Sequence, residues 1–205
     1  MLKDMKVHEF LDELASSSPT PGGGSASALL CSIGASLLCM VCRLTIGKKD
    51  YEQSEAELKK ILEEVEILRK KSERLVDEDT EAFNIVMDAY KTPKDNPLRP
   101  NIIQNALRNA NAAPMQIAET GIRVLELSKA VAFKGNVKSI SDVGVAVLAA
   151  DSGVRGSLMN LRINLQAMKD DMSKGEMLTK VKGMEDRTKV LFDEANSIIS
   201  FKLRN

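Results

Sequence analysis

The sequence predicts an all-α protein: a single-domain helical bundle with a buried central helix and one very long helix. Residues 26–42 contain no charged side chain, and residues 50–90 contain neither glycine nor proline. No segment alternates polar and apolar residues over enough positions to form a sheet. The 205 residues include no internal repeat and no low-complexity linker, so we expect one domain over residues 1–205.

Composition argues against two classes of function. The chain has 29 basic and 29 acidic residues, no tryptophan and 3% aromatic residues. We therefore expect no nucleic-acid partner, because such proteins use basic surfaces and aromatic stacking. The single histidine, His8, lies in an amphipathic stretch and is expected on a helix surface. One histidine and three cysteines do not make an ordinary zinc site without carboxylates, so we predict no metal.

The three cysteines are expected to be core residues. Cys31, Cys39 and Cys42 all lie in the apolar segment. Cys39 and Cys42 have C-x-x-C spacing, but the expected setting is a buried helix rather than the strand-to-helix turn of a redox motif. An odd number of cysteines and the lack of a signal peptide favour the reducing cytoplasm.

The chain is expected to begin with a short helix followed by a loop rich in proline and glycine. Residues 7–14 carry apolar side chains at helical spacing. In the loop, Pro19 and Pro21 restrict the backbone, and Gly22-Gly23-Gly24 lets it turn and approach another group closely. The next helix begins with unpaired N–H groups, which suit a carbonyl or an anion. Two interpretations stay open: a plain stop between helices, or a ligand-binding turn.

The central helix is expected over Ser25–Ile46. Its uncharged run, residues 26–42, is just short of the roughly 20 residues that span a bilayer, and no second such segment follows. We therefore predict no membrane span. Ser27, Cys31 and Ala35 recur every four residues, and such small side chains let helix backbones approach closely. We expect this helix to be buried on all sides, partly by a second copy of the chain in a two-fold dimer.

Prolines and glycines divide the rest of the chain into further helices. Pro100 can open a helix, and Pro114 is expected to kink or break it. The expected segments are one very long helix, or two nearly continuous ones, over 50–90, a loop over 92–97, a helix from 100 to Gly135-Asn136, and helices over 139–169 and 174–203.

One carboxylate of the long helix points towards the expected core. Turning about 100° per residue places Asp79 on the apolar arc of this helix. Asp77 lies off the edge of the arc, and Glu78 points to the opposite side. A buried carboxylate needs a partner or a chemical role. Asp79 is therefore either half of an ion pair with a neighbouring helix or a general acid/base whose pKa is tuned by burial.

The helix over 139–169 has two faces. About a quarter-turn from an ordinary apolar stripe lies a second face that is small in the middle and polar at both ends. Its small residues leave room for another helix or for a flat ligand, and asparagine amides can pair with a heterocycle. A tight helix crossing explains the same pattern equally well. The polar ends of this face are Asp142, Asn160 and Asn164.

Six short motifs occur in the order and with a spacing similar to those of a known family. Each is weak alone, but together they cover nearly the whole chain. Through them the chain resembles the cyclodeaminase/cyclohydrolase family of folate one-carbon metabolism, which includes the C-terminal domain of formiminotransferase-cyclodeaminase. The motifs are Pro19-Thr20-Pro21-Gly22-Gly23-Gly24-Ser25, Asp79-Thr80-Glu81-Ala82-Phe83, Pro114, Gly135-Asn136, Ser141-Asp142 and Asn160-Leu161-Arg162-Ile163-Asn164-Leu165.

The resemblance implies an all-helical fold, a homodimer as the minimal unit, and a reduced folate, with or without a polyglutamate tail, as substrate. The implied activity is cyclodeamination of 5-formimidoyltetrahydrofolate to 5,10-methenyltetrahydrofolate with release of ammonia. The alternatives are methenyltetrahydrofolate cyclohydrolase activity at the same site, or a folate-binding helical dimer without catalysis. Neither reaction requires a metal or a redox cofactor, so no cofactor is expected.

The resemblance also implies roles for individual residues. Asp79 is expected to be the acid/base, with Asp142 as second candidate or as stabiliser of the methenyl cation. The glutamate tail is expected to meet one of four basic residues: Lys48, Lys49, Lys138 or Arg162. The residues expected to bind substrate are Pro21, Gly22, Gly23, Gly24, Ser25, Asn136, Asn160 and Asn164.

Overall fold

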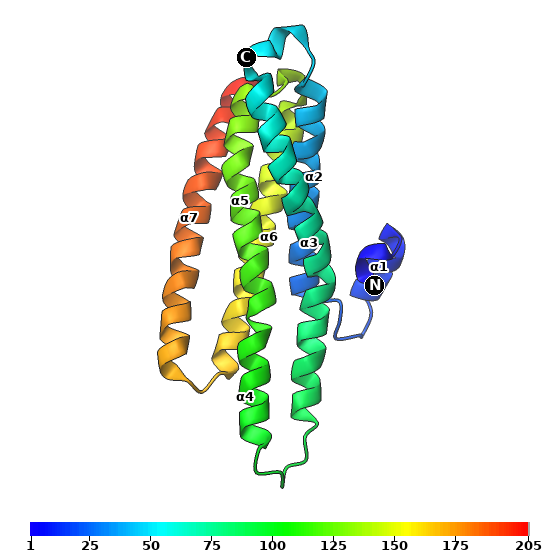
Figure 1. Ribbon diagram of the computed structural model, residues 1–205, viewed down its shortest axis with the longest axis vertical. Coiled ribbons are helices and arrows are strands. Elements are labelled where there is room, and N and C mark those ends of the chain that lie inside the picture. The colour runs from blue at the N-terminus through cyan, green and yellow to red at the C-terminus, as the bar shows by residue number, and fades with distance from the viewer. Residues whose placement is uncertain (205) are drawn as a thin grey trace.

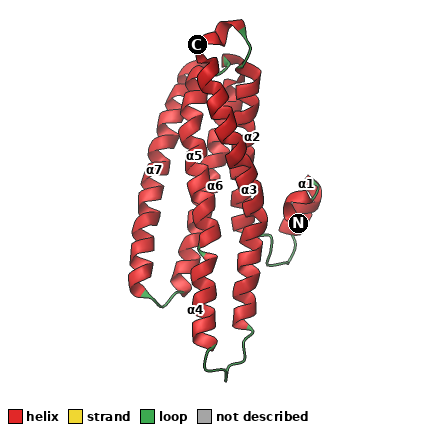
Figure 2. Cartoon of the chain, in the orientation of Figure 1, coloured by secondary structure: helices red, strands yellow, loops and turns green. Residues whose placement is uncertain are grey.

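The computed structural model describes residues 1–204, and this part of the chain contains helices but no strand (Figure 2). The predicted all-α fold is confirmed. Three short 3-10 turns, Leu2–Asp4, Lys49–Ser54 and Val137–Ser139, accompany the α-helices. The helices are α1 (Val7–Leu14), α2 (Gly23–Thr45), α3 (Glu55–Tyr90), α4 (Arg99–Ala110), α5 (Ala112–Lys134), α6 (Ile140–Ala167) and α7 (Asp171–Arg204).

The long helices run side by side along the long axis of the molecule (Figure 1). In this view α3, α5 and α7 lie in front, α2 and α6 lie behind them, and α4 continues the line of α5. The helix α2 packs mainly against α3 and α6, and α6 packs also against α5 and α7. The main hydrophobic core draws residues from α2 to α7, which makes the bundle one packed unit around α2, α5 and α6.

Small residues let α2 and α6 approach closely. A Cβ atom added to Gly34 would lie 2.9 Å from the carbonyl oxygen of Ala146, and one added to Gly153 would lie 2.7 Å from that of Ser27. The three cysteines are free and buried in this packing, as predicted. Burial raises the pKa of the Cys31 and Cys42 thiols to about 12 and that of Cys39 to about 11, so they are unreactive.

The helix α2 passes a simple test for a membrane span by length and composition, with a mean hydropathy of 2.0 over its most apolar window. However, 61% of this window is buried inside the chain. This burial is typical of the core helix of a bundle. No other helix in residues 1–204 passes the test.

The break predicted at Pro114 is confirmed. The helix α4 ends at Ala110, four residues before the proline, and α5 starts at Ala112. A proline ring clashes with the carbonyl four residues earlier and offers no N–H to it, so the helix cannot run straight through. The long helix also starts later than predicted, because Lys49–Ser54 forms a 3-10 turn and α3 begins only at Glu55.

Two side-chain environments differ from what the helical patterns alone indicate. The apolar stripe of α1 is largely exposed, with Val7 78% and Leu11 53% exposed, and only Phe10 of this helix is buried. The reason is that α1 lies beside the bundle rather than within it (Figure 1). Asp77 is buried rather than peripheral, because the first turn of the chain covers it and the Leu2 N–H donates to its carboxylate at 2.6 Å.

Candidate active site

The loop before α2, the start of α2, the middle of α3 and the end of α6 enclose a groove with a volume of about 230 Å³. We call it the Asp79 groove, since Asp79 is the only titratable residue among those that line it. Its lining residues are Pro19, Thr20, Gly22, Gly23, Gly24, Asp79, Ala82, Phe83, Val86, Ala110, Asn160 and Asn164.

Asp79 sits against the first turn of α2. A Cβ atom on Gly24 would overlap both carboxylate oxygens, so only glycine permits this approach. The Ser25 backbone N–H and hydroxyl both donate to the carboxylate, the hydroxyl at 3.2 Å. The carboxylate thus satisfies an N–H group that has no partner inside its own helix, and it faces the positive end of the α2 dipole.

Burial of Asp79 raises the pKa of its carboxyl above the ordinary value, although the hydrogen bonds from Ser25 oppose this shift. A carboxyl held nearer to neutrality can accept and return a proton during one reaction cycle. No ion pair with Asp79 occurs among the described residues, so the predicted ion-pair alternative is wrong.

Two asparagine side chains of α6 also line the groove. Asn160 donates through Nδ2 to the Gly156 carbonyl at 2.9 Å, and Asn164 donates to the Ala110 carbonyl at 3.4 Å. These bonds fix both amides while leaving their carbonyl oxygens available to accept from a ligand. The periodicity of the sequence correctly placed the two asparagines on one face, and the structure brings that face to Asp79.

The middle of the same α6 face is a tight helix crossing and not a binding surface. A Cβ atom on Gly153 would lie 2.5 Å from the Cys31 sulfur, and one on Gly156 would lie 2.5 Å from the Ser27 hydroxyl. Of the two interpretations left open by the sequence, the helix crossing is therefore correct for this stretch. Only the end that carries Asn160 and Asn164 faces an open space.

Asp142 and Asn136 do not reach the Asp79 groove within one chain. Asp142 lies in the first turn of α6, about 27 Å from Asn160 along the axis at a rise of about 1.5 Å per residue. Asn136 is buried at the same end, where its N–H donates to the Thr45 hydroxyl at 2.9 Å and its side chain accepts from the Lys138 N–H. Asp79 and Asp142, both expected to be catalytic, therefore lie far apart within one chain.

Several residues of the glycine-rich motif have roles different from those expected. Gly22, Gly23 and Gly24 line the groove, but Ser25 is completely buried and cannot touch a ligand in this conformation. Pro21 is buried too and does not line the groove. Its peptide bond with Thr20 is cis. The sequence prediction missed the lining residues Thr20, Ala82, Phe83, Val86, Ala110 and Pro19, whose small or apolar side chains carry no chemical signal.

None of the four basic residues proposed for the glutamate tail lines the groove. Arg162 is paired with Glu185 of α7, with Nη2 2.9 Å from Oε2. Lys48, Lys49 and Lys138 lie near the far end of the bundle, beside the turn that holds Asn136. Among residues 1–204, no group of three or more His, Cys, Asp and Glu side chains has the arrangement of a metal site.

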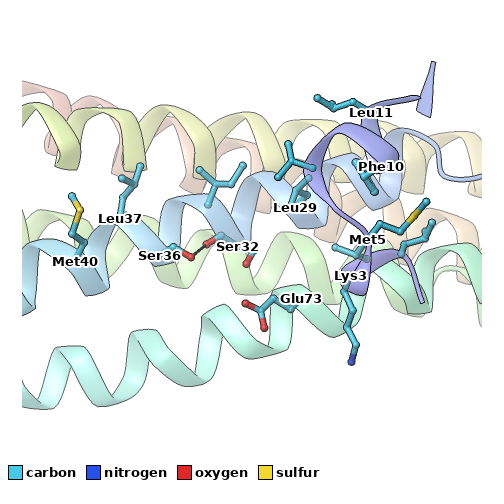
Figure 3. A pocket seen from close by; sticks show the side chains of 14 residues that line it. Lys3, Met5, Phe10, Leu11, Leu29, Ser32, Ser36, Leu37, Met40 and Glu73 are labelled. Atoms are coloured by element: carbon cyan, nitrogen blue, oxygen red, sulfur yellow. Dashed lines mark hydrogen bonds between the residues drawn. The ribbon is translucent and has the colours of Figure 1, made fainter. Parts of the chain in front are cut away.

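A larger cavity, of about 530 Å³, lies between the N-terminal segment and α2 (Figure 3). Its walls are mainly apolar, with Met5, Phe10, Leu29 and Leu37 among them. The Ser36 hydroxyl is used within its own helix, since it donates to the Ser32 carbonyl at 2.7 Å. The Asp79 groove is smaller, but it combines a carboxyl of raised pKa with two asparagine amides, so we assign the chemistry to it.

Residues 6–183 match the formiminotransferase-cyclodeaminase family, which extends over most of the chain. The chain belongs to this family. It is 43% identical over 182 residues to methenyltetrahydrofolate cyclohydrolase from Methylorubrum extorquens, and the match covers 87% of this chain and 88% of the relative. It is 33% identical over 177 residues to formimidoyltransferase-cyclodeaminase from Mus musculus, where the match covers 84% of this chain and 33% of the longer relative.

The fold also matches a solved structure of the family. The crystal structure of formiminotetrahydrofolate cyclodeaminase from Thermotoga maritima superposes with a TM-score of 0.90 at 28% identity, covering 98% of each chain. The family assignment from the sequence motifs is therefore confirmed, and with it a folate one-carbon enzyme of the cyclodeaminase/cyclohydrolase type.

Proposed function

We propose that the protein is a methenyltetrahydrofolate cyclohydrolase whose reaction takes place in the Asp79 groove. The observation that carries the proposal is the position of Asp79, which is half-buried, has a raised carboxyl pKa and faces a groove with no competing titratable group. The sequence identity of 43% over 88% of the length of a cyclohydrolase favours this reaction over cyclodeamination.

The proposed reaction needs only water and proton transfers. The Asp79 carboxylate accepts a proton from water while the water oxygen bonds to the methenyl carbon between N5 and N10. The bond from this carbon to N5 then breaks, and Asp79 returns its proton to N5. The hydroxyl on the carbon loses its proton to solvent, which leaves a formyl group on N10. Atoms and charge balance without a metal or redox cofactor.

The walls of the groove suit the polar edge of a pterin. The carbonyl oxygens of Asn160 and Asn164 can accept from the amino and ring N–H groups of the heterocycle. The first N–H groups of α2, at Gly23 and Gly24, can donate to the pterin carbonyl. The groove is smaller than the roughly 300–1,000 Å³ of ordinary ligand sites, so we place the rest of the folate outside it.

Cyclodeamination is the second candidate, favoured by the fold match to the Thermotoga maritima cyclodeaminase. In that reaction the formimidoyl nitrogen enters protonated, N10 attacks the formimidoyl carbon, and Asp79 takes the N10 proton and then gives it to the departing amine. Ammonia leaves, and the 5,10-methenyl cation remains. Both reactions pass through a tetrahedral carbon between two nitrogens, so the same groove and the same acid/base serve either.

A direct comparison of substrates tests the proposal. The purified protein is incubated in parallel with 5,10-methenyltetrahydrofolate and with 5-formimidoyltetrahydrofolate, and the absorbance of the methenyl form is followed. The proposal predicts that the methenyl form disappears much faster than its uncatalysed hydrolysis. Formation of the methenyl form and ammonia from the formimidoyl substrate alone would favour the second candidate. Calorimetric binding of both folates without any turnover would favour the binding module.

We further propose that the working unit is a homodimer in a reducing, cytoplasmic setting. Apolar side chains that are exposed or half-buried occur on both α2 and α6, and the α2 residues 26–42 carry no charge. A two-fold axis brings such a surface against itself, and an uncharged apolar surface is complementary to its own copy. We call it the α2–α6 face, and its residues are Leu30, Ile33, Leu37, Leu44, Val145 and Leu148.

The test of the dimer is the molar mass in solution by light scattering. We expect the parent protein at twice the chain mass of 22.4 kDa, and the Ile33→Asp variant shifted towards the monomer. Ile67→Asp, which places the same charge on an exposed position of α3, is the matched control and should remain dimeric. A monomeric parent protein at micromolar concentration would contradict the proposal.

A further inference from the structure

The Ser25 hydroxyl lies buried directly behind Asp79. It carries one hydrogen atom but lies within hydrogen-bond distance of three oxygen atoms. Its oxygen is 2.9 Å from the Val76 carbonyl oxygen, 3.2 Å from Asp79 Oδ2 and 3.1 Å from the Thr80 hydroxyl. Ser25 is fully buried, so water does not supply a further hydrogen bond there. The one hydroxyl hydrogen of Ser25 therefore cannot serve both Val76 and Asp79 at once, whereas the Thr80 hydroxyl can donate to the Ser25 oxygen.

The protonation state of Asp79 determines which oxygen atom accepts the hydrogen bond from Ser25. A carbonyl oxygen only accepts, so Val76 always needs the hydrogen of Ser25 for this bond. An ionised Asp79 also only accepts and competes for the same hydrogen. A protonated Asp79 carries a hydrogen of its own and can donate it to the Ser25 oxygen, which leaves Ser25 free to donate to Val76. The two protonation states of Asp79 thus match two orientations of one hydroxyl.

We propose that Ser25 is a positioning residue for the proton transfer, a hydroxyl that turns towards Asp79 when the carboxylate is ionised and towards Val76 when it is protonated. Thr80, one turn from Val76 on α3, holds the Ser25 oxygen in place in both orientations. The inference rests on the proposed role of Asp79 as acid/base, and it gives the motif serine a role other than binding substrate.

Among the described residues, no titratable group other than Asp79 lines the groove. The residues that line the groove from the loop, α2, α6 and the end of α4 are all uncharged. On α3, Glu78 and Glu81 are exposed, and the carboxylate of Asp77 accepts from the Leu2 N–H. A change in the titration of Asp79 on altering Ser25 is therefore attributable to the hydroxyl itself.

A purely structural role is the alternative, in which Ser25 only ties α2 to α3. Both roles predict some loss of stability in Ser25→Ala. Only the positioning role predicts a shift in the titration of Asp79, because the hydrogen bond that the variant loses from the ionised carboxylate is charge-assisted and stronger than the neutral one that it loses from the protonated form. Loss of a hydrogen bond to a charged group corresponds to a shift of about one pH unit or more.

The experiment compares Ser25→Ala and Thr80→Val with the control Ser128→Ala, which removes an equally buried hydroxyl that donates to the Leu125 carbonyl of its own helix. The titration of the Asp79 carboxyl is followed by carbon NMR in the protein without substrate, and the pH profile of kcat is measured beside it. We expect the Asp79 pKa and the acid limb of the profile to move up by about one pH unit in Ser25→Ala. A smaller shift in the same direction is expected in Thr80→Val, and none in the control.

The NMR titration needs no turnover, so it separates this inference from the proposed function. An unshifted Asp79 in folded Ser25→Ala and Thr80→Val would overturn the inference, whatever the protein catalyses. A shifted Asp79 in a protein that turns over neither folate would support the hydroxyl's role while contradicting the proposed function. If Ser25→Ala fails to fold, Thr80→Val alone decides, and an unshifted Asp79 there would overturn the inference.

Discussion

Asp79 has a structural task and a proposed chemical task at once. Its carboxylate accepts from the Ser25 N–H at the start of α2 and so joins two helices that are distant in sequence. The same contact directs the carboxylate into the groove beside Asn160. A structural cap would be served equally well by an asparagine, whereas an acid/base would not. This difference makes the two tasks separable by experiment.

The first prediction concerns the stability of Asp79→Asn. Burial raises the folded-state pKa of this carboxyl, so its contribution to stability is complete below about pH 4 and is lost as the pH rises through the folded pKa. The variant has no such loss. We expect its melting temperature to equal that of the parent in acid and to exceed it by a few degrees at pH 8. A variant that is less stable than the parent at pH 8 would show that the ionised carboxylate is stabilising after all.

A second prediction compares two neighbouring glycines of the groove. A Cβ atom on Gly24 overlaps the Asp79 carboxylate, so Gly24→Ala should lose about 1–3 kcal/mol of unfolding free energy and most of kcat. A Cβ atom on Gly23 would lie 3.3 Å from Asn160 Nδ2, and a small shift of that amide relieves the contact. We expect Gly23→Ala to raise KM several-fold with little loss of stability. Equal effects of both substitutions, measured by denaturation and steady-state kinetics, would contradict this geometry.

At the scale of the helix, the sequence predicted where helices break and which side chains share a helix face. The break near Pro114 follows from the geometry of proline, and the position of Asn160 and Asn164 follows from the period of α6. The exposure of α1 could not be predicted, because an amphipathic helix looks the same whether it packs into the core or lies beside it. Met87 is likewise exposed although it lies on the apolar arc of α3, since α3 runs on beyond the start of α2 (Figure 1).

The sequence did not predict that Asp142 lies far from the other residues of the candidate site. A helical wheel gives the direction of a side chain but not its distance along the axis. Asp142 and Asn160 therefore fall on one face although about 27 Å divides them at about 1.5 Å per residue. Ser25 was also assigned wrongly to substrate binding, because burial behind Asp79 depends on how α2 packs against α3. Both errors come from tertiary packing, which a local pattern does not contain.

A third prediction tests the α2–α6 crossing. Gly153→Ala places a methyl group 2.7 Å from the Ser27 carbonyl oxygen and should cost about 1–3 kcal/mol of unfolding free energy. Gly183→Ala, in the middle of α7 with nothing within 4 Å, should instead stabilise the protein by about 0.5–1 kcal/mol. Chemical denaturation of both variants measures the difference. If the two substitutions had the same sign, the close approach of α2 and α6 would be in doubt.

At the scale of the whole molecule, the candidate site residues lie at two separate places along the bundle. One end carries the Asp79 groove, and the other carries Asp142 together with Lys48, Lys49 and Lys138. A two-fold axis perpendicular to the helices would pair the α2–α6 faces of two chains in antiparallel fashion. The far end of one chain would then lie beside the groove of the other. This arrangement is the way in which Asp142 can still contribute to the site proposed around Asp79.

A fourth prediction follows for mixed dimers. Asp79→Asn and Asp142→Asn chains are each expected to be inactive alone. After unfolding and refolding together at equal amounts, half of the dimers would contain one chain of each kind and one intact site, so about a quarter of the parent activity should return. If Asp142→Asn is fully active alone, Asp142 has no part in the chemistry. If the mixture stays inactive while light scattering shows mixed dimers, the antiparallel arrangement is wrong.

The central claim, that Asp79 carries the proton in a folate one-carbon reaction, is tested most directly by the turnover of Asp79→Asn. The rate of methenyltetrahydrofolate hydrolysis is measured by absorbance beside Glu78→Gln, which changes the exposed neighbouring carboxylate. The account predicts that Asp79→Asn loses about 10²–10⁴-fold in kcat while its circular dichroism and folate binding are retained, and that Glu78→Gln stays near the parent rate. A folded Asp79→Asn variant that turns over at the parent rate would contradict it.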